Sequence, residues 1–300
     1  MLYRQTFLKT YIMFKQISLS VAALVLLTSC SIKEDRINNC SAPVSVQVQD
    51  FRVTIDNISD TKATDVADYP NLKALTLAFY EGETEVFKST QKQGDAGFGN
   101  FSLNLPLGTY TMVVLGYSCY EGDVLTLTSP TQAAFTAGRV GETFAHTQEV
   151  VISNTNAVEL SATLDRIVSK LFVVSDDKRP EGAEKVRMTF SGGAKAFNPS
   201  TGLATSNTGF SNTVTTSTDV GKRSGSVSYL FLNSTDQTMD VTIDVLDAED
   251  AVLFHKVVRN VPFKVNRSTK LTGNVYTATA PGATTFQVNE EWITESTVSF

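Results

Sequence analysis

Apolar and polar residues alternate in short runs along most of the chain. Clear examples lie at residues 44–48, 72–80 and 101–105. Alternation with a period of two predicts half-buried β-strands, and no segment keeps the 3.6-residue period of an amphipathic helix between caps. Pro106-Leu107-Gly108 follows the third run, and this combination is typical of a tight turn. The pattern therefore predicts an all-β chain.

Similar runs continue to the end of the chain. They lie at residues 110–117, 124–128, 143–152, 158–164, 167–174, 185–190, 226–232, 239–246, 252–258, 264–266 and 269–276. Many short strands separated by turn residues predict β-sandwiches or barrels. Residues 198–225 are rich in Ser, Thr, Asn and Gly, which predicts a long loop with room for one short strand.

The length of 300 residues favours two domains over one. The polar segment Ser153-Asn154-Thr155-Asn156 interrupts the alternation near the middle of the chain. We therefore expect an N-terminal sandwich at residues 44–157 and a C-terminal sandwich at residues 158–300. The two halves are similar in style but show no strict sequence repeat.

The first thirty residues resemble the export signal of a bacterial lipoprotein. An apolar run at residues 21–27 follows Lys15 and is too short to span a bilayer, which predicts a signal peptide at residues 1–29. Leu27-Thr28-Ser29-Cys30 resembles a lipobox, in which the cysteine receives a diacylglycerol and becomes the mature N-terminus. We expect lipidation of Cys30 and a tether at residues 30–43. The alternative is an ordinary signal peptide with an incidental cysteine, and Met13 is a second candidate start.

The residues after Cys30 add a surface-export signal. Lys33-Glu34-Asp35 resembles the charged tag of Bacteroidetes surface lipoproteins, which implies the outer face of the outer membrane; a plain solvated tether is the alternative. Removing residues 1–29 shifts the net charge from −6 to −9. An acidic body is repelled by anionic lipid, so attachment must come from the acyl chains.

Composition argues against most kinds of chemistry. There are two histidines, His146 and His255, and three cysteines, too few for a histidine-rich metal site or most zinc modules. A histidine base beside a Ser or Cys nucleophile has no support. The pI near 5.1 argues against nucleic acid as a partner. We expect no enzyme activity, no catalytic residue, no metal and no cofactor.

Two cysteines remain once Cys30 is assigned to lipid. In an exported protein Cys40 and Cys119 could form a disulfide, or could stay as two free thiols.

The C-terminal segment has the pattern of a terminal strand. Its apolar residues Phe286, Val288, Trp292 and Ile293 follow Ala280-Pro281-Gly282, which predicts a hinge. A strand after a hinge either closes its own sheet or adds to the open edge of a partner.

Several segments in order resemble the fimbrillin and fimbrial-anchor lipoproteins of Bacteroidetes, the subunits of type V pili. They are Cys30 with Lys33-Glu34-Asp35, the strand–turn–strand stretch at residues 101–117, the passage into the second domain at residues 164–171, the hairpin at residues 261–274, and the late Trp292.

The resemblance implies two transthyretin-like sandwich domains without catalysis. It also implies that a protease cuts polymerising members after a basic residue near the N-terminus, here Arg36 or Arg52, and that a neighbour's strand fills the vacated groove. Anchor members escape the cut and keep their lipid. We therefore expect a fimbrial subunit or anchor on the cell surface, in the fimbrium. Its partners would be other fimbrial subunits, the outer membrane, and ligands on host or bacterial surfaces.

The alternative is a surface glycan-binding lipoprotein of a polysaccharide uptake system. Such sites use exposed aromatic rings, and the candidates are Tyr69, Tyr80, Tyr117 and Tyr120. Aromatic residues on strands are more often part of the core.

Overall fold

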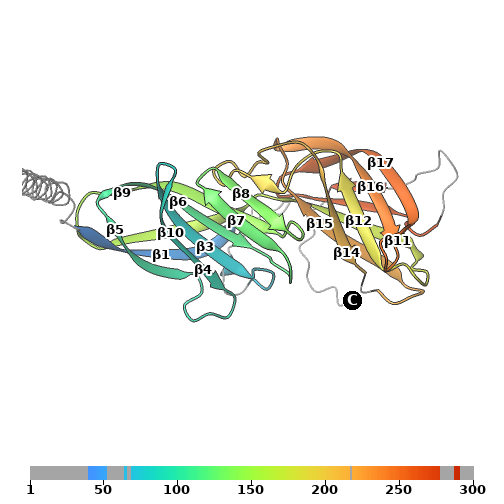
Figure 1. The fold of residues 1–300 in the computed structure, drawn as a ribbon, viewed down its shortest axis with the longest axis horizontal. Helices are drawn as coiled ribbons and strands as arrows, with labels where there is room; N and C mark the ends of the chain where they lie inside the picture. Colours follow the sequence, from blue (N-terminus) through green and yellow to red (C-terminus); the bar gives the residue numbers. More distant parts are fainter. Residues whose placement is uncertain (1–39, 53–63, 66–68, 217, 278–286, 291–300) are drawn as a thin grey trace, which may run out of the picture.

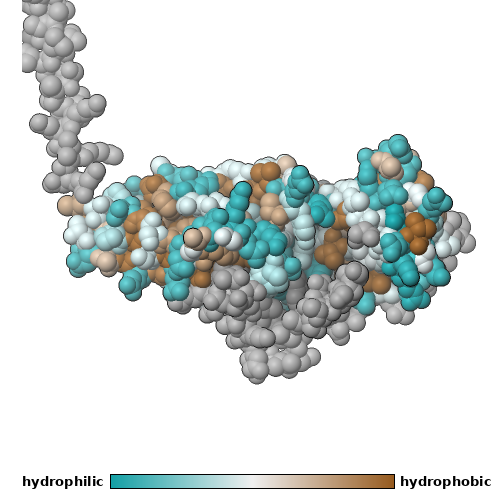
Figure 2. All heavy atoms as spheres, turned by 90° about the horizontal axis from the view of Figure 1, so that it is seen from below, coloured by the Kyte–Doolittle hydropathy of each residue, from teal (hydrophilic) through white to brown (hydrophobic). Residues whose placement is uncertain are grey.

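The computed structural model describes residues 40–52, 64–65, 69–216, 218–277 and 287–290. These residues form strands, turns and loops, and contain no helix, so the prediction of an all-β chain is confirmed. None of them forms a helix that is long and apolar enough to cross a membrane. Two lobes lie side by side along the long axis (Figure 1). Polar and apolar residues are interspersed on the face shown in Figure 2, as is usual for a surface in contact with water.

The first lobe contains one large sheet that folds over on itself. Its strand order is β2-β1-β10-β9-β6-β3-β4, and β5 pairs with β1. The strands are β1 (Ser41–Arg52), β2 (Thr64–Asp65), β3 (Ala74–Glu81), β4 (Thr84–Lys92), β5 (Asn100–Pro106), β6 (Gly108–Tyr117), β9 (Thr143–Ile152) and β10 (Val158–Arg166). β9 and β10 pair only at two positions, Asp165 with Ala145 and Arg166 with Phe144. At this corner, β5-β1-β10 turns to face β9-β6-β3-β4.

The core of the first lobe lies between these two layers. Its buried residues are Ala42, Val44, Val46, Val48, Phe101, Leu105, Ala162 and Leu164 from one layer and Leu75, Leu77, Phe79, Tyr110, Met112, Val114, Phe144, Val150 and Ile152 from the other. Alternate residues of each strand point inward, as the period-two pattern predicts.

β3 and β6 are covered on their outer face as well. A three-stranded sheet of β7 (Val124–Ser129), β8 (Gln132–Ala137) and β13 (Ala196–Phe197) supplies Leu127, Phe135 and Phe197 to a second cluster with the outward residues of β3 and β6. Burial on both faces explains why these two strands carry nearly continuous apolar runs. β13 comes from the second half of the chain, so this sheet joins the lobes.

The second lobe is a sandwich of two four-stranded sheets. Their orders are β15-β11-β18-β19 and β14-β12-β16-β17. The strands are β11 (Ser169–Lys178), β12 (Lys185–Phe190), β14 (Phe210–Thr215), β15 (Arg223–Leu230), β16 (Asp236–Leu246), β17 (Val252–Lys264), β18 (Ser268–Gly273) and β19 (Gln287–Glu290). The predicted loop at 198–225 contains one complete short strand, β14, and the start of β15. The run at 252–258 and the first residue of the run at 264–266, Lys264, belong to a single long strand, β17, whereas residues 265–266 form the turn after it.

The chain passes between the lobes at Ile167–Val168. β10 lies after the break at residue 157, yet it pairs with β1 and β9 of the first lobe. Because strand pairing, and not alternation, decides membership of a sheet, we propose that the domain boundary lies at residues 167–168. The proposed domains then become residues 44–166 and 169–300, in place of 44–157 and 158–300.

Candidate assembly site

The first strand of the described chain, β1, lies between β5 and β10 in the first lobe. We call the groove that it occupies the slot. The side chains of Ala42, Val44, Val46 and Val48 are at most 4% exposed and pack in the core. Pro43, Ser45 and Gln47, between them, are exposed. The alternation of β1 thus separates a core face from a solvent face.

β1 has a hydrogen-bonded partner on each edge. On one side it pairs antiparallel with β5, from Ser41 opposite Pro106 to Gln47 opposite Asn100. On the other side it pairs parallel with β10, starting at Val44 opposite Val158. Without β1, the facing edges of β5 and β10 would lose their backbone partners, and the core beneath would be open to water.

The apolar residues of β1 contribute substantially to the stability of the lobe. Burial of a valine side chain is worth about 1.5–3 kcal/mol, so Val44, Val46 and Val48 together contribute on the order of 5 kcal/mol or more. That amount is comparable with the whole net stability of many domains, about 5–15 kcal/mol. An empty slot would therefore strongly favour any strand able to replace β1.

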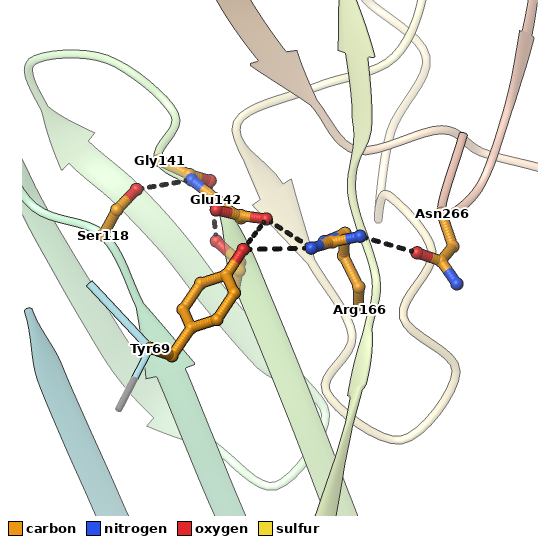
Figure 3. A network of polar contacts seen from close by, with 7 residues as sticks. Tyr69, Ser118, Gly141, Glu142, Arg166 and Asn266 are labelled. Carbon is orange, nitrogen blue, oxygen red and sulfur yellow. Dashed lines mark hydrogen bonds and ion pairs between the residues drawn. The ribbon is translucent and has the colours of Figure 1, made fainter. Parts of the chain in front are cut away.

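A buried polar network stands at the corner beside this slot (Figure 3). Arg166, the last residue of β10, forms an ion pair with Glu142 at 2.7 Å, and both side chains are at most 3% exposed. The Tyr69 hydroxyl donates to Glu142 Oε1 at 2.8 Å and accepts from Arg166 Nη2 at 3.1 Å. Burial and the Glu142 carboxylate raise the pKa of Tyr69 well above its usual value. We call Tyr69, Glu142, Arg166 and Asn266 the corner network.

Asn266 connects this network to the second lobe. Its Oδ1 accepts a hydrogen bond from Arg166 Nη1 at 3.2 Å, and its backbone N–H donates to the Val168 carbonyl at 3.0 Å. Asn266 lies in the turn between β17 and β18 at φ 59°, a left-handed conformation that asparagine tolerates. The structure therefore brings together two segments that the sequence resemblance singled out, residues 164–171 and 261–274. The sequence did not identify Glu142 as the partner; its only signal is a charge beside the apolar start of β9.

The candidate donor strand lies on its own sheet where the structure describes it. β19 pairs antiparallel with β18, with Val288 opposite Leu271. Phe286, Trp292 and Ile293 lie outside the described residues. Before the hinge, the Asp177 carboxylate accepts hydrogen bonds from Val275 N and Tyr276 N at 2.8 Å each and from Thr277 Oγ1 at 2.9 Å. Asp177 thus fixes the chain just ahead of the terminal segment.

The disulfide between Cys40 and Cys119 is not formed, and both thiols are free. The two residues lie at opposite ends of β6. The Cys40 carbonyl accepts from Leu107 N just before β6, whereas Cys119 lies two residues after its end, where Sγ donates to the Asp123 carbonyl at 2.8 Å. A ten-residue strand spans roughly 30 Å, far beyond the ~7 Å limit between bridged Cα atoms.

The other candidate residues do not gather into one site. His146 Nδ1 lies 3.1 Å from the Thr163 carbonyl in the first lobe, and His255 Nδ1 lies 2.7 Å from Asp244 in the second. Tyr80 and Tyr117 are buried, Tyr69 belongs to the corner network, and Tyr120 is 57% exposed. The described part of the chain holds no cluster of three or more metal-ligating side chains.

The N-terminal candidates divide between described and undescribed residues. Cys30, the tag Lys33-Glu34-Asp35, and Arg36 lie outside the described part of the chain. Arg52 is the last residue of β1, and in the strand register its Cα lies opposite that of Asp165 in β10.

Comparison with known proteins gives one family and several distant structural likenesses. The sequence model of a family of unknown function, DUF6562, matches residues 43–299. No curated protein sequence matches the chain significantly. Each similar structure reported below has a TM-score under 0.5, a range in which the likeness transfers no function.

Three of the similar solved structures come from Bacteroides and Porphyromonas. A candidate adhesin from Bacteroides thetaiotaomicron has 12% identity and a TM-score of 0.48, over 86% of this chain and 99% of that one. The fimbrial anchor protein Mfa2 from Porphyromonas gingivalis has 12% identity and a TM-score of 0.45, over 78% and 91%. A candidate polysaccharide-binding protein from Bacteroides thetaiotaomicron has 11% identity and a TM-score of 0.45, over 85% and 99%.

Proposed function

We propose that this chain, which belongs to the DUF6562 family of unknown function, is a fimbrial subunit or fimbrial anchor of the cell surface that assembles by β-strand exchange. The observation that carries the proposal is β1, an N-terminal strand that fills a slot between β5 and β10 with four core-facing side chains. The resemblance of the sequence motifs to fimbrillin lipoproteins supports it. This role is structural and adhesive and needs no catalytic residue.

The position of β1 distinguishes the two candidate cleavage sites. Arg52 is the last residue of β1, so a cut after Arg52 would separate the whole strand from the rest of the chain. A cut after Arg36 would leave β1 in its slot, because β1 begins at Ser41. Cleavage after Arg52 is therefore the one that prepares the slot for a neighbour's strand, and an uncut chain would act as an anchor.

The corner network would remain intact after such a cut. Tyr69, Glu142, Arg166 and Asn266 all follow Arg52 in the sequence, and they hold the end of β10 beside β9 and the second lobe. The β10 side of the slot would keep its position while β1 is absent. The incoming strand would be the terminal segment of another copy, with Phe286, Val288, Trp292 and Ile293 as its apolar residues.

The lipid anchor and β1 belong to the same N-terminal piece. In our proposal Cys30 carries the lipid at the outer membrane, Lys33-Glu34-Asp35 directs export to the surface, and the tether leads directly into β1. A cut after Arg52 would then both release the body from the membrane and open the slot. Replacing Cys30 with Ala should move the protein from the membrane to the soluble fraction, and unchanged membrane retention would refute lipidation.

Treatment with an arginine-specific protease tests strand exchange. We expect mass spectrometry to find cleavage after Arg52, followed by loss of the β1 peptide and formation of a ladder of oligomers. Arg52→Gln should remain monomeric, whereas the matched Arg36→Gln should assemble normally. Deletion of residues 284–300 should give a folded, cleavable chain that does not assemble. Normal fibres from that deletion, or a chain that loses β1 and stays monomeric, would contradict the proposal.

A further inference from the structure

A groove with a volume of ≈ 230 Å³ opens between the two lobes. One wall of the groove is formed by residues of β14 and β15. Two loops of the first lobe contribute Tyr120 and Arg139 to its lining. In the part of the chain that the structure describes, β14 pairs only with β12 and β15 only with β11. The groove therefore follows a seam where the two sheets of the second lobe separate.

The lining of this seam is unusually polar for its position. Ser226 and Ser228 are at most 7% exposed and lie on the same side of β15 as the core residue Leu230. Core-facing positions of a strand are normally apolar, and departures from this pattern concentrate at functional sites. The two buried serines thus point to a ligand and not to packing alone.

Asn212 of β14 supplies an unsatisfied acceptor at the same place. Its side chain is buried, and its Nδ2 donates to Ser228 Oγ at 2.6 Å and to the Tyr229 carbonyl at 3.2 Å. Its Oδ1 is buried without a hydrogen-bond donor among the described residues. A buried carbonyl oxygen without a partner costs about 1–3 kcal/mol, so a small shift that admitted a ligand hydroxyl would relieve this cost.

A cation stands at the mouth of the groove. The Arg139 guanidinium lies 4.5 Å from the centre of the Tyr120 ring, and within the described ranges its side chain has no ion pair or hydrogen bond. Asp123 accepts instead from the backbone: Tyr120 N donates to Oδ2 at 3.1 Å and Arg139 N to Oδ1 at 2.7 Å. One carboxylate thus fixes both loops and leaves the guanidinium available.

Gly138 makes this arrangement possible. Its φ is +68°, and a Cβ at this position would lie 2.1 Å from Asp123 Oδ1. Only glycine lets the loop that carries Arg139 approach Asp123 so closely. The pair of Tyr120 and Arg139 is therefore held in place before any ligand arrives, which lowers the entropic cost of binding.

We propose that this groove binds a carboxylated saccharide, such as a sialic or uronic acid. The Arg139 guanidinium pairs with the carboxylate, because a charge-assisted hydrogen bond to a planar anion is the strongest contact it can make. Asn212, Ser226 and Ser228 bind ring hydroxyls, and Tyr120 contacts the apolar face of the ring. The volume is below the range of about 300–1,000 Å³ for drug-sized ligands, so one sugar ring fits and a long glycan does not.

This binding site is independent of strand exchange. An extended peptide could pair with the edges of β14 and β15 that have no strand partner among the described residues. Such a strand has no need of the buried serines or of an arginine whose side chain makes no ion pair within the same ranges. The observations therefore favour the sugar.

Titration of the mature chain with simple sugars tests the proposal. The probes are the methyl glycosides of N-acetylneuraminic acid and glucuronic acid, with methyl glucoside as the neutral control, followed by calorimetry and by saturation-transfer NMR. We expect one acidic sugar to bind, and the neutral sugar to bind at least about tenfold more weakly because it lacks the charge-assisted contact.

Three variants identify the site. Arg139→Gln should weaken binding about tenfold or more, and Arg139→Lys should keep part of it. Arg259→Gln, at an exposed position on β17, is the matched control and should bind like the parent chain. Failure of both acidic sugars to bind, or full binding by Arg139→Gln, would overturn the proposal. Arg139-dependent binding of an acidic peptide in place of either sugar would also overturn it and would identify a peptide site.

Discussion

Arg166 donates a hydrogen bond to Asn266, 100 residues further along the chain, and this contact joins the two lobes. Arg166 ends β10, the strand beside β1, whereas Asn266 occupies the turn that leads into β18, the strand beside β19. Each strand that we propose to exchange thus lies beside a strand that ends or begins near this contact: Arg166 ends β10, and Asn266 lies two residues before β18.

Removing the arginine should destabilise the protein strongly. Arg166→Ala leaves Glu142 buried without its counter-charge, and breaking one partner of a buried ion pair costs about 3–5 kcal/mol. Urea denaturation should show a correspondingly lower free energy of unfolding. Arg187→Ala, which removes a partly exposed partner of Asp244, is the comparison and should cost less. Equal losses in both variants would contradict the special weight given to the corner network.

The two faces of β1 should respond differently to the same charge. Val46→Asp places a carboxylate in the core and should lower the free energy of unfolding by about 3 kcal/mol or more. Ser45→Asp adds the same charge on the exposed face and should change it by less than about 0.5 kcal/mol. The measurement is denaturation together with hydrogen exchange of β5 and β10. Similar effects at both positions would mean that β1 does not fill the slot as described.

Stability should decline in alkaline solution, in part because of Tyr80. Burial, with a further contribution from Glu85, raises the pKa of Tyr80 from 10 to about 12. Below pH 10 the phenol of Tyr80 is neutral in both the folded and the unfolded chain. Between pH 10 and about 12 the unfolded chain loses this proton while the folded chain keeps it, so stability falls as the pH rises. Tyr80→Phe should make the fall shallower across this window, and an unchanged pH profile would contradict the assignment.

Asp177 should control access to the terminal segment. Asp177→Ala removes the acceptor of three hydrogen bonds from residues 275–277, which should raise the rates of amide exchange at Val275 and Tyr276 and of proteolysis after them. Bonds to a charged acceptor are worth about 1.5–3 kcal/mol each, so exchange should accelerate at least tenfold. Asp176→Ala, at the exposed neighbouring position, should leave exchange unchanged. If both variants exchange at the same rate, Asp177 does not hold residues 275–277 in place.

Most strands with an apolar face could be predicted from the sequence, although β8 was missed: only two of its six residues, Ala133 and Phe135, are buried apolar residues. β3 and β6 are evident because both of their faces are buried. β4, by contrast, escaped prediction because its side chains are exposed or half-buried and its pairing with β3 is made by the backbone. A backbone ladder at a sheet edge leaves no hydropathy signal.

Contacts between residues far apart in the chain could not be predicted from the sequence either. The pattern of β1 predicts a strand but not that β10, more than a hundred residues later, lies beside it. For the same reason the alternation around residue 157 could not show that β10 belongs to the first lobe. Glu142 and Arg166 form an ion pair only because the sheet folds at the corner between β9 and β10.

The slot around β1 also has a direction. β1 runs parallel to β10 and antiparallel to β5, so a strand that reproduces its pairs must enter with its N-terminal end beside Pro106 and its C-terminal end beside Asp165. A second copy bound in this way makes a head-to-tail contact, and each further copy repeats the same rotation and advance. The resulting fibre would be polar, with an unfilled slot at one end and an unused donor strand at the other, and it could grow at each end only by a different reaction.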